Sequence, residues 1–515
     1  MTARTAPTAM IREWLGRFVA RRESWSLITA RGWHDRARGA ALRGRCGRDD
    51  GGRGGGNALD AALAAAAALT VTYPHQCSVG GDLVAIVRPA GGTPRAVLSI
   101  GAAAAGTDVA ALRARGDRMP AGGPDTVTVP GVVAGWAAIA RLGARLPLAD
   151  LLAPAIALAR DGVPASTGLR RAIAARRDAI RADPGLRAVL PADGEPLVQP
   201  ALADTLTAIA ANWRTFYKGH LAHRLVAGLR ALGSPLSITD FATHRAEVVE
   251  PLSTTVDGVR WYAAPPPAQG ATLLGILGSA DLVTAARQAQ LRRDALLGDP
   301  RTGPVDVDAL MLRRTVAAAA TPALARPMGD TAAVTAVGDD GTAVTLIQSV
   351  YQSFGAGILD PATGIVLHNR GSAFSLDETH PGVLRPGSRP PHTLCPALAL
   401  AGDAVVALGC QGGRSQPWIL AQVAADVLAA GDLPALLSRP RWVIGARDIG
   451  RTDPTLLLEP GTPGGFSATA ERLGLDLATT SGPHDDAGHV QVARLRGGTL
   501  DAASDVRADG RAVVR

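Results

Sequence analysis

Two runs of β-type sequence around the turn GDDG constrain the fold more than any other feature of this 515-residue chain. They span residues 331–349, TAAVTAVGDDGTAVTLIQS. Glycine and aspartate in a short turn between two alternating runs are typical of a β-hairpin. The first run opens on Thr331, directly after Gly-Asp, so the hairpin places a hydroxyl at the start of a strand. Threonine is also a common strand former, which leaves both a structural and a reactive role open.

Helical and strand-like patterns divide the rest of the chain. Residues 57–72 predict a helix with Asn57 as its N-cap and Asp60 in its first turn. Two strands joined by the turn AGGTPR follow, and residues 130–235 and 284–325 are helical in pattern. Period-two runs begin at Thr331 and end before a helix at 416–431. Strands in series with covering helices predict stacked sheets with helical outer layers.

The net charge of +8 is concentrated at the N-terminus. Residues 1–53 contain 12 arginines and five acidic residues, whereas the other 41 basic and 40 acidic residues nearly balance. A nucleic-acid-binding body carries its own basic face, so we predict no nucleic-acid partner. No stretch reaches the ~18–20 apolar residues of a membrane span, and no apolar signal segment is evident. We therefore predict a cytoplasmic protein without a membrane partner.

Residues 1–55 differ in composition from the rest, being rich in arginine and glycine. We predict a basic extension that is disordered or that results from a reading-frame error. The segment IREWLGRFVARR also fits a basic amphipathic helix, which leaves a membrane-surface role as an alternative.

Common catalytic and metal-binding signatures are missing. The sequence has no GxSxG, HExxH or GxxxxGK[ST] motif, and Lys218 is its only lysine. His220 and His223 are three residues apart on a predicted helix and could form half of a metal site. No third ligand is indicated, and the four cysteines lack metal-binding spacing. We therefore predict no metal and no cofactor.

Cleavage of the peptide bond between Asp330 and Thr331 would give the threonine a reactive role. The new α-amino group would have a pKa of about 7.7–8.0, against about 10.4 for lysine, and would act as a base near neutral pH. One residue would then supply both nucleophile and base. The cut itself can begin with attack of Thr331 Oγ on the Asp330 carbonyl, which gives an ester that water hydrolyses.

A set of motifs follows a fixed order along the chain: GGNALDAALAAAAAL, YPHQCSVGGDL, TVTVPGVVAGW, LPLADLLAPAIALARDGVPAS, FYKGHLAHRL, PPPAQG, GDTAAVTAVGDDGTAVTLIQS, FGAGILDPATGIVLHNRGSAFSLD, GSRPPHTLCPAL, GCQGG and DVRADG. From about Gly55 to the end, this ordered set resembles the γ-glutamyltransferase family of N-terminal-nucleophile hydrolases. The resemblance implies an α+β fold, specifically a four-layer αββα sandwich. It also implies a proenzyme that cuts itself before Thr331.

The resemblance further implies two fragments, 56–330 and 331–515, that stay together as a heterodimer. Thr331 matches the nucleophile, and Asp330 lies on the other side of the autoprocessing bond. Ser349 matches a second hydroxyl that hydrogen-bonds the nucleophile's amine. Gly412 and Gly413 match the pair whose N–H groups form the oxyanion hole.

Several positions depart from the family's pattern for binding a glutamyl group. Gly101 or Ala102 stands where the family has an arginine, and Ala373 stands where it has an acid. Without these two charged anchors a zwitterionic substrate binds much more weakly, so glutathione is not the predicted substrate. The other departures are His392 and Thr393 for a serine pair, Ala332 after the nucleophile, and Tyr351 for a pocket asparagine.

These departures bring the chain closer to a branch that resembles oxamate amidohydrolases and acylases. We predict a hydrolase for a small acyl or amide substrate of the oxalyl type, with Tyr351, Arg370, His392 and Thr393 as substrate-binding candidates. One alternative is a C–C bond hydrolase of alkylproline antibiotic biosynthesis that uses the same site. Another is a scaffold that has kept the fold and lost catalysis.

Overall fold

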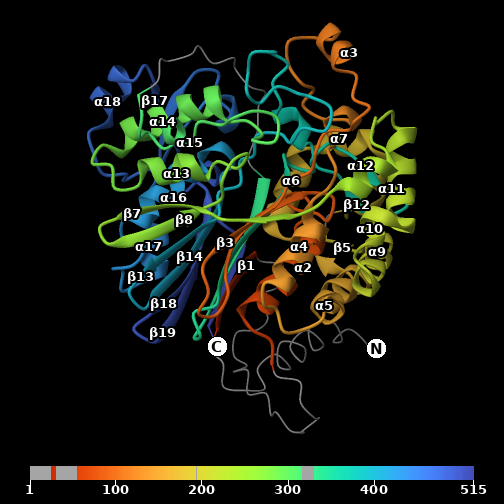
Figure 1. Ribbon diagram of the computed structural model, residues 1–515, viewed down its shortest axis with the longest axis horizontal. Coiled ribbons are helices and arrows are strands. Elements are labelled where there is room, and N and C mark those ends of the chain that lie inside the picture. The colour runs from red at the N-terminus through yellow and green to blue at the C-terminus, as the bar shows by residue number, and fades with distance from the viewer. Residues whose placement is uncertain (1–24, 31–54, 193, 316–329, 515) are drawn as a thin grey trace.

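The computed structural model describes residues 25–30, 55–192, 194–315 and 330–514 (Figure 1). Within them, a seven-stranded sheet has the strand order β20-β1-β9-β10-β2-β3-β6, with antiparallel neighbours throughout. Its strands are β20 (Gly510–Val514), β1 (Trp25–Ala30), β9 (Asp330–Gly338), β10 (Ala343–Tyr351), β2 (Asp82–Arg88), β3 (Arg95–Ser99) and β6 (Glu247–Val249). The hairpin expected around GDDG is confirmed as β9 and β10 at the centre of this sheet.

A second antiparallel sheet packs against the first. In the described part of the chain it has six strands in the order β19-β18-β14-β13-β8-β7. They are β19 (Thr499–Ser504), β18 (His489–Arg496), β14 (Ala404–Gln411), β13 (Ala397–Ala401), β8 (Val259–Ala263) and β7 (Leu252–Val256). A buried apolar cluster joins the two sheets, with Ala333 and Ile347 from the first and Ala407 and Ala493 from the second.

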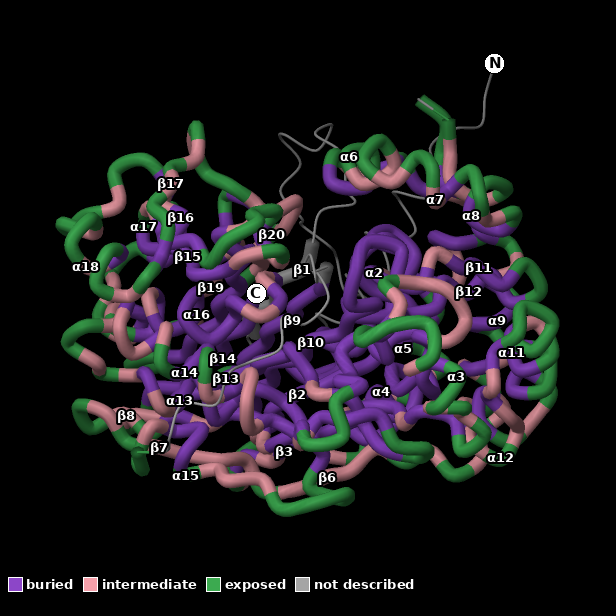
Figure 2. Tube along the Cα trace, turned by 90° about the horizontal axis from the view of Figure 1, so that it is seen from above, coloured by how far each residue is buried: buried purple, intermediate pink, exposed green. Residues whose placement is uncertain are grey.

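Helices cover the opposite face of each sheet (Figures 1 and 2). The first sheet packs against α2 (Ala58–Thr72) and α4 (Val132–Arg141), and α5 (Leu148–Asp161) packs on α2. The second sheet packs against α13 (Gly270–Ile276) and α16 (Gln416–Ala424), and α14 (Leu282–Leu296) packs on these two helices. Alternation along β9 reflects this arrangement, because Ala332 and Val334 face the helices while Ala333 and Val337 face the second sheet. The prediction of a mixed helix-and-sheet fold is confirmed.

The remaining elements lie around these layers. The helices are α3 (Val109–Ala114), α6 (Thr167–Ala175), α7 (Arg177–Ala182), α8 (Pro184–Val189), α9 (Pro200–Ala211), α10 (Thr215–Lys218), α11 (His220–Ala231), α12 (Ile238–Thr243), α15 (Val307–Leu310), α17 (Leu433–Ser438) and α18 (Phe466–Arg472). The strands are β4 (Val163–Pro164), β5 (Pro196–Leu197), β11 (Leu359–Asp360), β12 (Ile365–Val366), β15 (Trp442–Gly445), β16 (Thr455–Leu458) and β17 (Asp476–Thr479).

Strand β1 falls within the N-terminal segment for which the sequence predicted a disordered or misread extension. It pairs with β20 on one side and β9 on the other. The sequence did not indicate this strand, and the rest of residues 1–54 lies outside the described part of the chain. Among the described residues, no helix is long and apolar enough to cross a membrane.

The start of α2 is fixed by the predicted N-cap. Asn57 Oδ1 accepts hydrogen bonds from the N–H groups of Leu59 and Asp60, and the Asp60 carboxylate accepts one from Asn57 N in return. Asp60 also accepts the N–H groups of Arg145 and Leu146, which precede α5. This buried carboxylate therefore joins two helices of the layer that covers the first sheet.

We predict that Asp60→Ala lowers the free energy of unfolding by about 3–5 kcal/mol, because it leaves three backbone N–H groups without their acceptor. Thermal unfolding followed by circular dichroism measures the effect. Asp150→Ala is the matched control, since Asp150 is an exposed acid in the first turn of α5, and it should cost about 1 kcal/mol or less. Equal losses in the two variants would contradict the assigned role of Asp60.

Candidate active site

The β9–β10 pair brings the two predicted hydroxyls together. Ala332 pairs with Gln348 and Asp330 with Tyr351, and the register shifts between these two pairs. Thr331 Oγ1 donates a hydrogen bond to Ser349 Oγ at 3.2 Å, although the two residues are 18 positions apart. Ser349 Oγ also accepts the N–H of Tyr351 at 2.8 Å. Both hydroxyl residues are buried, so their mutual position is set by the sheet.

Tyr351 lies at the irregular end of β10 in a strained conformation. Its φ of 78° is in the left-handed region, which costs a residue other than glycine about 1–3 kcal/mol. The Arg370 guanidinium carbon lies 3.8 Å from the centre of the Tyr351 ring. The register shift and this contact together fix the direction in which the ring points.

A glycine turn follows β14, the strand that crosses β9. At Gly409, a Cβ would lie 2.8 Å from Thr345 Cγ2 and 3.4 Å from Ala333 Cβ, so glycine allows the two sheets to approach closely here. The strand ends at Gln411, and Gly412 and Gly413 follow with φ values of 149° and 51°. A Cβ on Gly412 would lie 2.6 Å from Ile419 Cδ1. The sequence therefore needs glycine at this turn for both conformation and space.

Gln269 ties the glycine turn to the neighbouring strand region. Its side-chain Nε2 donates to the carbonyl of Gly413 at 3.0 Å and also to the carbonyl of Thr393. Its Oε1 accepts from Arg293 Nη1 at 2.8 Å. Gln269 belongs to the PPPAQG motif, but the sequence alone did not indicate this bridging role.

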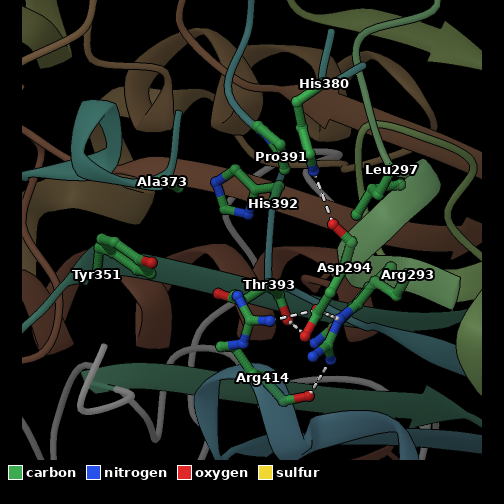
Figure 3. A pocket seen from close by; sticks show the side chains of 11 residues that line it. Arg293, Asp294, Leu297, Tyr351, Ala373, His380, Pro391, His392, Thr393 and Arg414 are labelled. Carbon is green, nitrogen blue, oxygen red and sulfur yellow. Dashed lines mark hydrogen bonds and ion pairs between the residues drawn. The ribbon is translucent and has the colours of Figure 1, made fainter. Parts of the chain in front are cut away.

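A small pocket opens beside these elements (Figure 3). Three of the four predicted substrate-binding residues line it, namely Tyr351, His392 and Thr393. Ala373, which stands in place of an acid, is also in the wall. The other lining residues are Gln269, Arg293, Asp294, Leu297, His380, Pro391 and Arg414.

Arg370, the fourth candidate, is not among the residues that line the pocket. It is fully buried against Tyr351, and its Nη1 donates to Thr393 Oγ1 at 3.1 Å. Burial lowers the pKa of Arg370 to about 10, so it remains charged at neutral pH. In this position Arg370 supports two wall residues from outside the pocket.

Both ring nitrogens of His392 form hydrogen bonds with other residues of the protein. Its Nδ1 accepts the N–H of Leu394 at 3.3 Å, which leaves Nε2–H to donate to Asp82 Oδ2 at 3.3 Å. Burial lowers the pKa of His392 well below its ordinary value, so the ring is neutral. His392 therefore presents the face of a neutral ring to the pocket rather than a charge.

Asp82 is the centre of a buried polar cluster that the sequence analysis did not identify. Its Oδ1 accepts the N–H of Gly101 at 3.0 Å, and its Oδ2 lies 3.5 Å from Nδ1 of His368. Burial raises the pKa of Asp82 to about 7, although Arg370 and the N–H groups of Gly101 and Gly131 oppose the shift. The GGDL motif contains this residue, but its partners lie far away in the sequence.

Backbone packing excludes an arginine at Gly101, which lies two residues after the end of β3, the second strand of the first hairpin. A Cβ on Gly101 would lie 1.6 Å from the carbonyl oxygen of Val129, so no side chain fits at this position. Of the two candidate positions, Gly101 therefore cannot carry an arginine unless this backbone moves.

Possible metal ligands do not gather at this site. In the ranges that the structure describes, no group of three or more His, Cys, Asp or Glu residues could hold a metal ion. His220 and His223 are both exposed on α11.

Comparison with known sequences shows which family the chain belongs to. The profile described as "Gamma-glutamyltranspeptidase" matches residues 53–514. The chain belongs to the gamma-glutamyltranspeptidase family. The similar proteins described below are named as proenzymes, and the family consists of hydrolases and transferases. The suspected family membership and the prediction that the protein is an enzyme are thus confirmed.

Similar proteins in the family include two bacterial proenzymes. The oxamate amidohydrolase proenzyme of Klebsiella pneumoniae is 37% identical over 503 residues, with 89% of this chain and 94% of that protein covered. The glutathione hydrolase-like YwrD proenzyme of Bacillus subtilis is 36% identical over 427 residues, with 76% and 81% covered.

Two solved structures are similar over nearly the whole chain. Cephalosporin acylase from Bacillus halodurans has a TM-score of 0.79 at 28% identity, with 95% of this chain and 96% of that chain covered. LmbA2991HD has a TM-score of 0.78 at 27% identity, with 90% and 94% covered. The suspected branch near the acylases and the antibiotic-pathway enzymes is consistent with both.

We predict that Asp82→Asn flattens the pH dependence of stability between about pH 4 and pH 7. Asp82 ionises near its ordinary value of 3.8 when unfolded and near 7 when folded. The neutral carboxyl therefore favours the folded state fully below pH 3.8, and this contribution is lost as the pH rises to about 7, at about 1.4 kcal/mol per pH unit.

Unfolding temperatures of wild type and variant across this pH range measure the difference. Asp204→Asn, which neutralises an exposed carboxylate on α9, is the control and should keep the wild-type slope. Parallel pH profiles for wild type and Asp82→Asn would mean that Asp82 ionises alike in both states.

Proposed function

We propose that this protein is a self-processing hydrolase whose Thr331 attacks the carbonyl of a small oxalyl-type amide. The observation that carries the proposal is the 3.2 Å hydrogen bond from Thr331 Oγ1 to Ser349 Oγ at the start of β9. It supports the assignment of Thr331 as nucleophile because a buried hydroxyl beside a second hydroxyl can be oriented before the chain is cut. Asp330 provides the carbonyl for the cut.

The proposed reaction uses groups that the site already holds. After the cut, the α-amine of Thr331 takes the proton from Oγ as it attacks the substrate amide. The N–H groups of Gly412 and Gly413 stabilise the developing oxyanion, and loss of one such donor typically costs about 10²–10³ in rate. The amine leaves with a proton, and water then hydrolyses the threonine ester. For oxamate the products are oxalate and ammonia.

The same proposal includes a four-layer fold and an assembly of two fragments. Two face-to-face sheets with helices on both outer faces support the four-layer αββα sandwich predicted from the resemblance. Residues 56–330 and 331–515 would remain a heterodimer after the cut, because β9 lies between β1 and β10 and both fragments share one core. A cytoplasmic location stays a prediction.

The absence of an acid at position 373 favours an oxalyl-type substrate over a glutamyl group. The pocket wall has Ala373 where an amine-binding acid was expected, and it contains no residue that replaces it on the same element. The similarity to an oxamate amidohydrolase proenzyme supports the same substrate class. C–C bond hydrolysis at the same site remains the alternative.

We predict that purified wild-type protein contains a fragment with Thr331 as its new N-terminus and that Thr331→Ala remains one chain. Removal of Oγ removes the attacking atom, so the loss of cleavage should be complete. Intact-mass spectrometry and N-terminal sequencing measure it.

Thr335→Ala is the matched control, since Thr335 is a buried threonine on the same strand whose Oγ1 has no hydrogen-bond partner within the described residues. It should be cut like wild type. A wild-type protein that stays whole under native conditions would favour the non-catalytic scaffold instead.

We also predict that the cut protein releases ammonia from oxamate in preference to a γ-glutamyl amide, because it lacks both charged anchors for a glutamyl group. Each anchor would supply a charge-assisted hydrogen bond, so the ratio of kcat/KM values should be at least about 100. A coupled ammonia assay measures both reactions. A preference for the γ-glutamyl substrate would contradict the proposed substrate class, while leaving the nucleophile assignment intact.

A further inference from the structure

One wall of the pocket carries a cluster of charged groups that the reaction described above does not use. Arg293 and Arg414 both line the pocket, and Asp294 lies between them (Figure 3). Arg293 Nε donates to Asp294 Oδ1 at 2.9 Å, and Arg414 Nη2 forms an ion pair with the same oxygen. Two arginines thus share one carboxylate in the wall.

The backbone of Arg414 is positioned by the glycine turn before it and by a hydrogen bond to its carbonyl oxygen. It directly follows Gly412 and Gly413, and its own carbonyl accepts a hydrogen bond from Arg293 Nη1 at 2.5 Å. Figure 3 shows its guanidinium between Asp294 and Tyr351, facing the pocket space. The Arg414 side chain is 14% exposed, against 4% for Arg293.

The cluster keeps spare donors for an anion. Of the Arg293 nitrogens, Nη2 is buried without a hydrogen-bond partner among the described residues. The guanidinium of Arg414 has five N–H donors, and its single partner in the described part of the chain is Asp294. Unused, largely buried donors of a cation are costly unless a ligand accepts from them.

Electrostatics keep the cationic groups charged. Although burial raises the pKa of Asp294, Arg293 and Arg414 outweigh it and hold the pKa below its ordinary range. Burial lowers the pKa of Arg414, but Asp294 and Asp448 raise it above its ordinary value. Asp448 does not line the pocket, and burial raises its pKa. Two arginines and one carboxylate thus line the pocket, and Asp448 adds a second acidic group near Arg414 from outside the lining.

We propose that Arg414, with Arg293 behind it, binds the carboxylate of the substrate acyl group. This inference rests on the proposed function and assigns the substrate's charge to a particular residue. Arg414 directly follows the proposed oxyanion glycines in the sequence, and the pocket wall that it shares with Tyr351 reaches Ser349 and Thr331 through the hydrogen bond from Tyr351 N–H to Ser349 Oγ. An anion bound by Arg414 is therefore placed on the side of the pocket that leads to the proposed nucleophile. The site therefore fits an acid whose carboxylate is directly next to, or within about one carbon of, the scissile carbonyl.

The test compares oxamate with oxamide, its neutral isostere, and uses oxalate as a non-hydrolysed anion. Isothermal titration calorimetry measures oxalate and oxamide binding to the purified full-length protein, and ammonia release measures turnover of oxamate. In Arg414→Gln we expect oxalate affinity and the kcat/KM for oxamate to fall by about ten- to a hundredfold. Oxamide binding should change by less than about threefold.

Two further variants separate charge recognition from structural damage. Arg414→Lys keeps the charge but not the planar pair of donors, so it should recover part of the oxalate affinity. Arg472→Gln removes an arginine from an exposed ion pair with Asp281 and should leave oxalate binding unchanged. Asp294 keeps Arg293 as its partner in Arg414→Gln, so that variant does not leave a buried carboxylate unpaired.

The inference is overturned if oxalate fails to bind wild type, or if Arg414→Gln binds oxalate as wild type does. It is also overturned if oxalate and oxamide lose affinity equally. Failure of the proposed function has a different signature, namely the absence of a Thr331 N-terminus in the mass spectrum, and calorimetry of the uncut chain still reports on Arg414.

Discussion

The register of the β9–β10 pair is the constraint on which the rest of the site depends. Side chains alternate along a strand, so a slip of one residue would turn Thr331 towards the helices. In the observed register Thr331 shares the face of Ala333, which packs against the second sheet. That face meets β14 at Gly409, and β14 leads into the glycine turn. The packing of the two sheets thus brings the strand that begins with Thr331 against the strand that leads into the glycine turn.

Burial between the sheets determines the electrostatics around this hydroxyl. The intersheet core is apolar, and the polar groups at its end are satisfied mainly by backbone donors and by each other. Asp82 and His392 illustrate the result, because burial favours the neutral form of both. Charge at the pocket is consequently confined to the arginines and to Asp294, where ion pairs offset the loss of water.

Local features of the fold were predictable from sequence, and long-range partners were not. The hairpin and the Asn57 cap depend on neighbouring residues, so turn and capping rules sufficed. The contact of His392 with Asp82 spans 310 residues, and that of Gln269 with Gly413 spans 144. No spacing rule reaches that far. In the sequence, Arg293 and Asp294 indicate only the polar surface of a helix. The packing of α14 places both residues in the pocket wall.

The placement of cations links the missing arginine to the choice of substrate. Contact with the Val129 carbonyl excludes a side chain at position 101, so a cation from the first hairpin cannot reach the site from there. The arginines at the pocket come instead from α14 and from the residue after the glycine turn. Arg414 directly follows Gly412 and Gly413, the residues that we propose as oxyanion donors. An acyl group held by both Arg414 and these donors, as we propose, would be short, so this arrangement favours a two-carbon acid over a glutamyl chain.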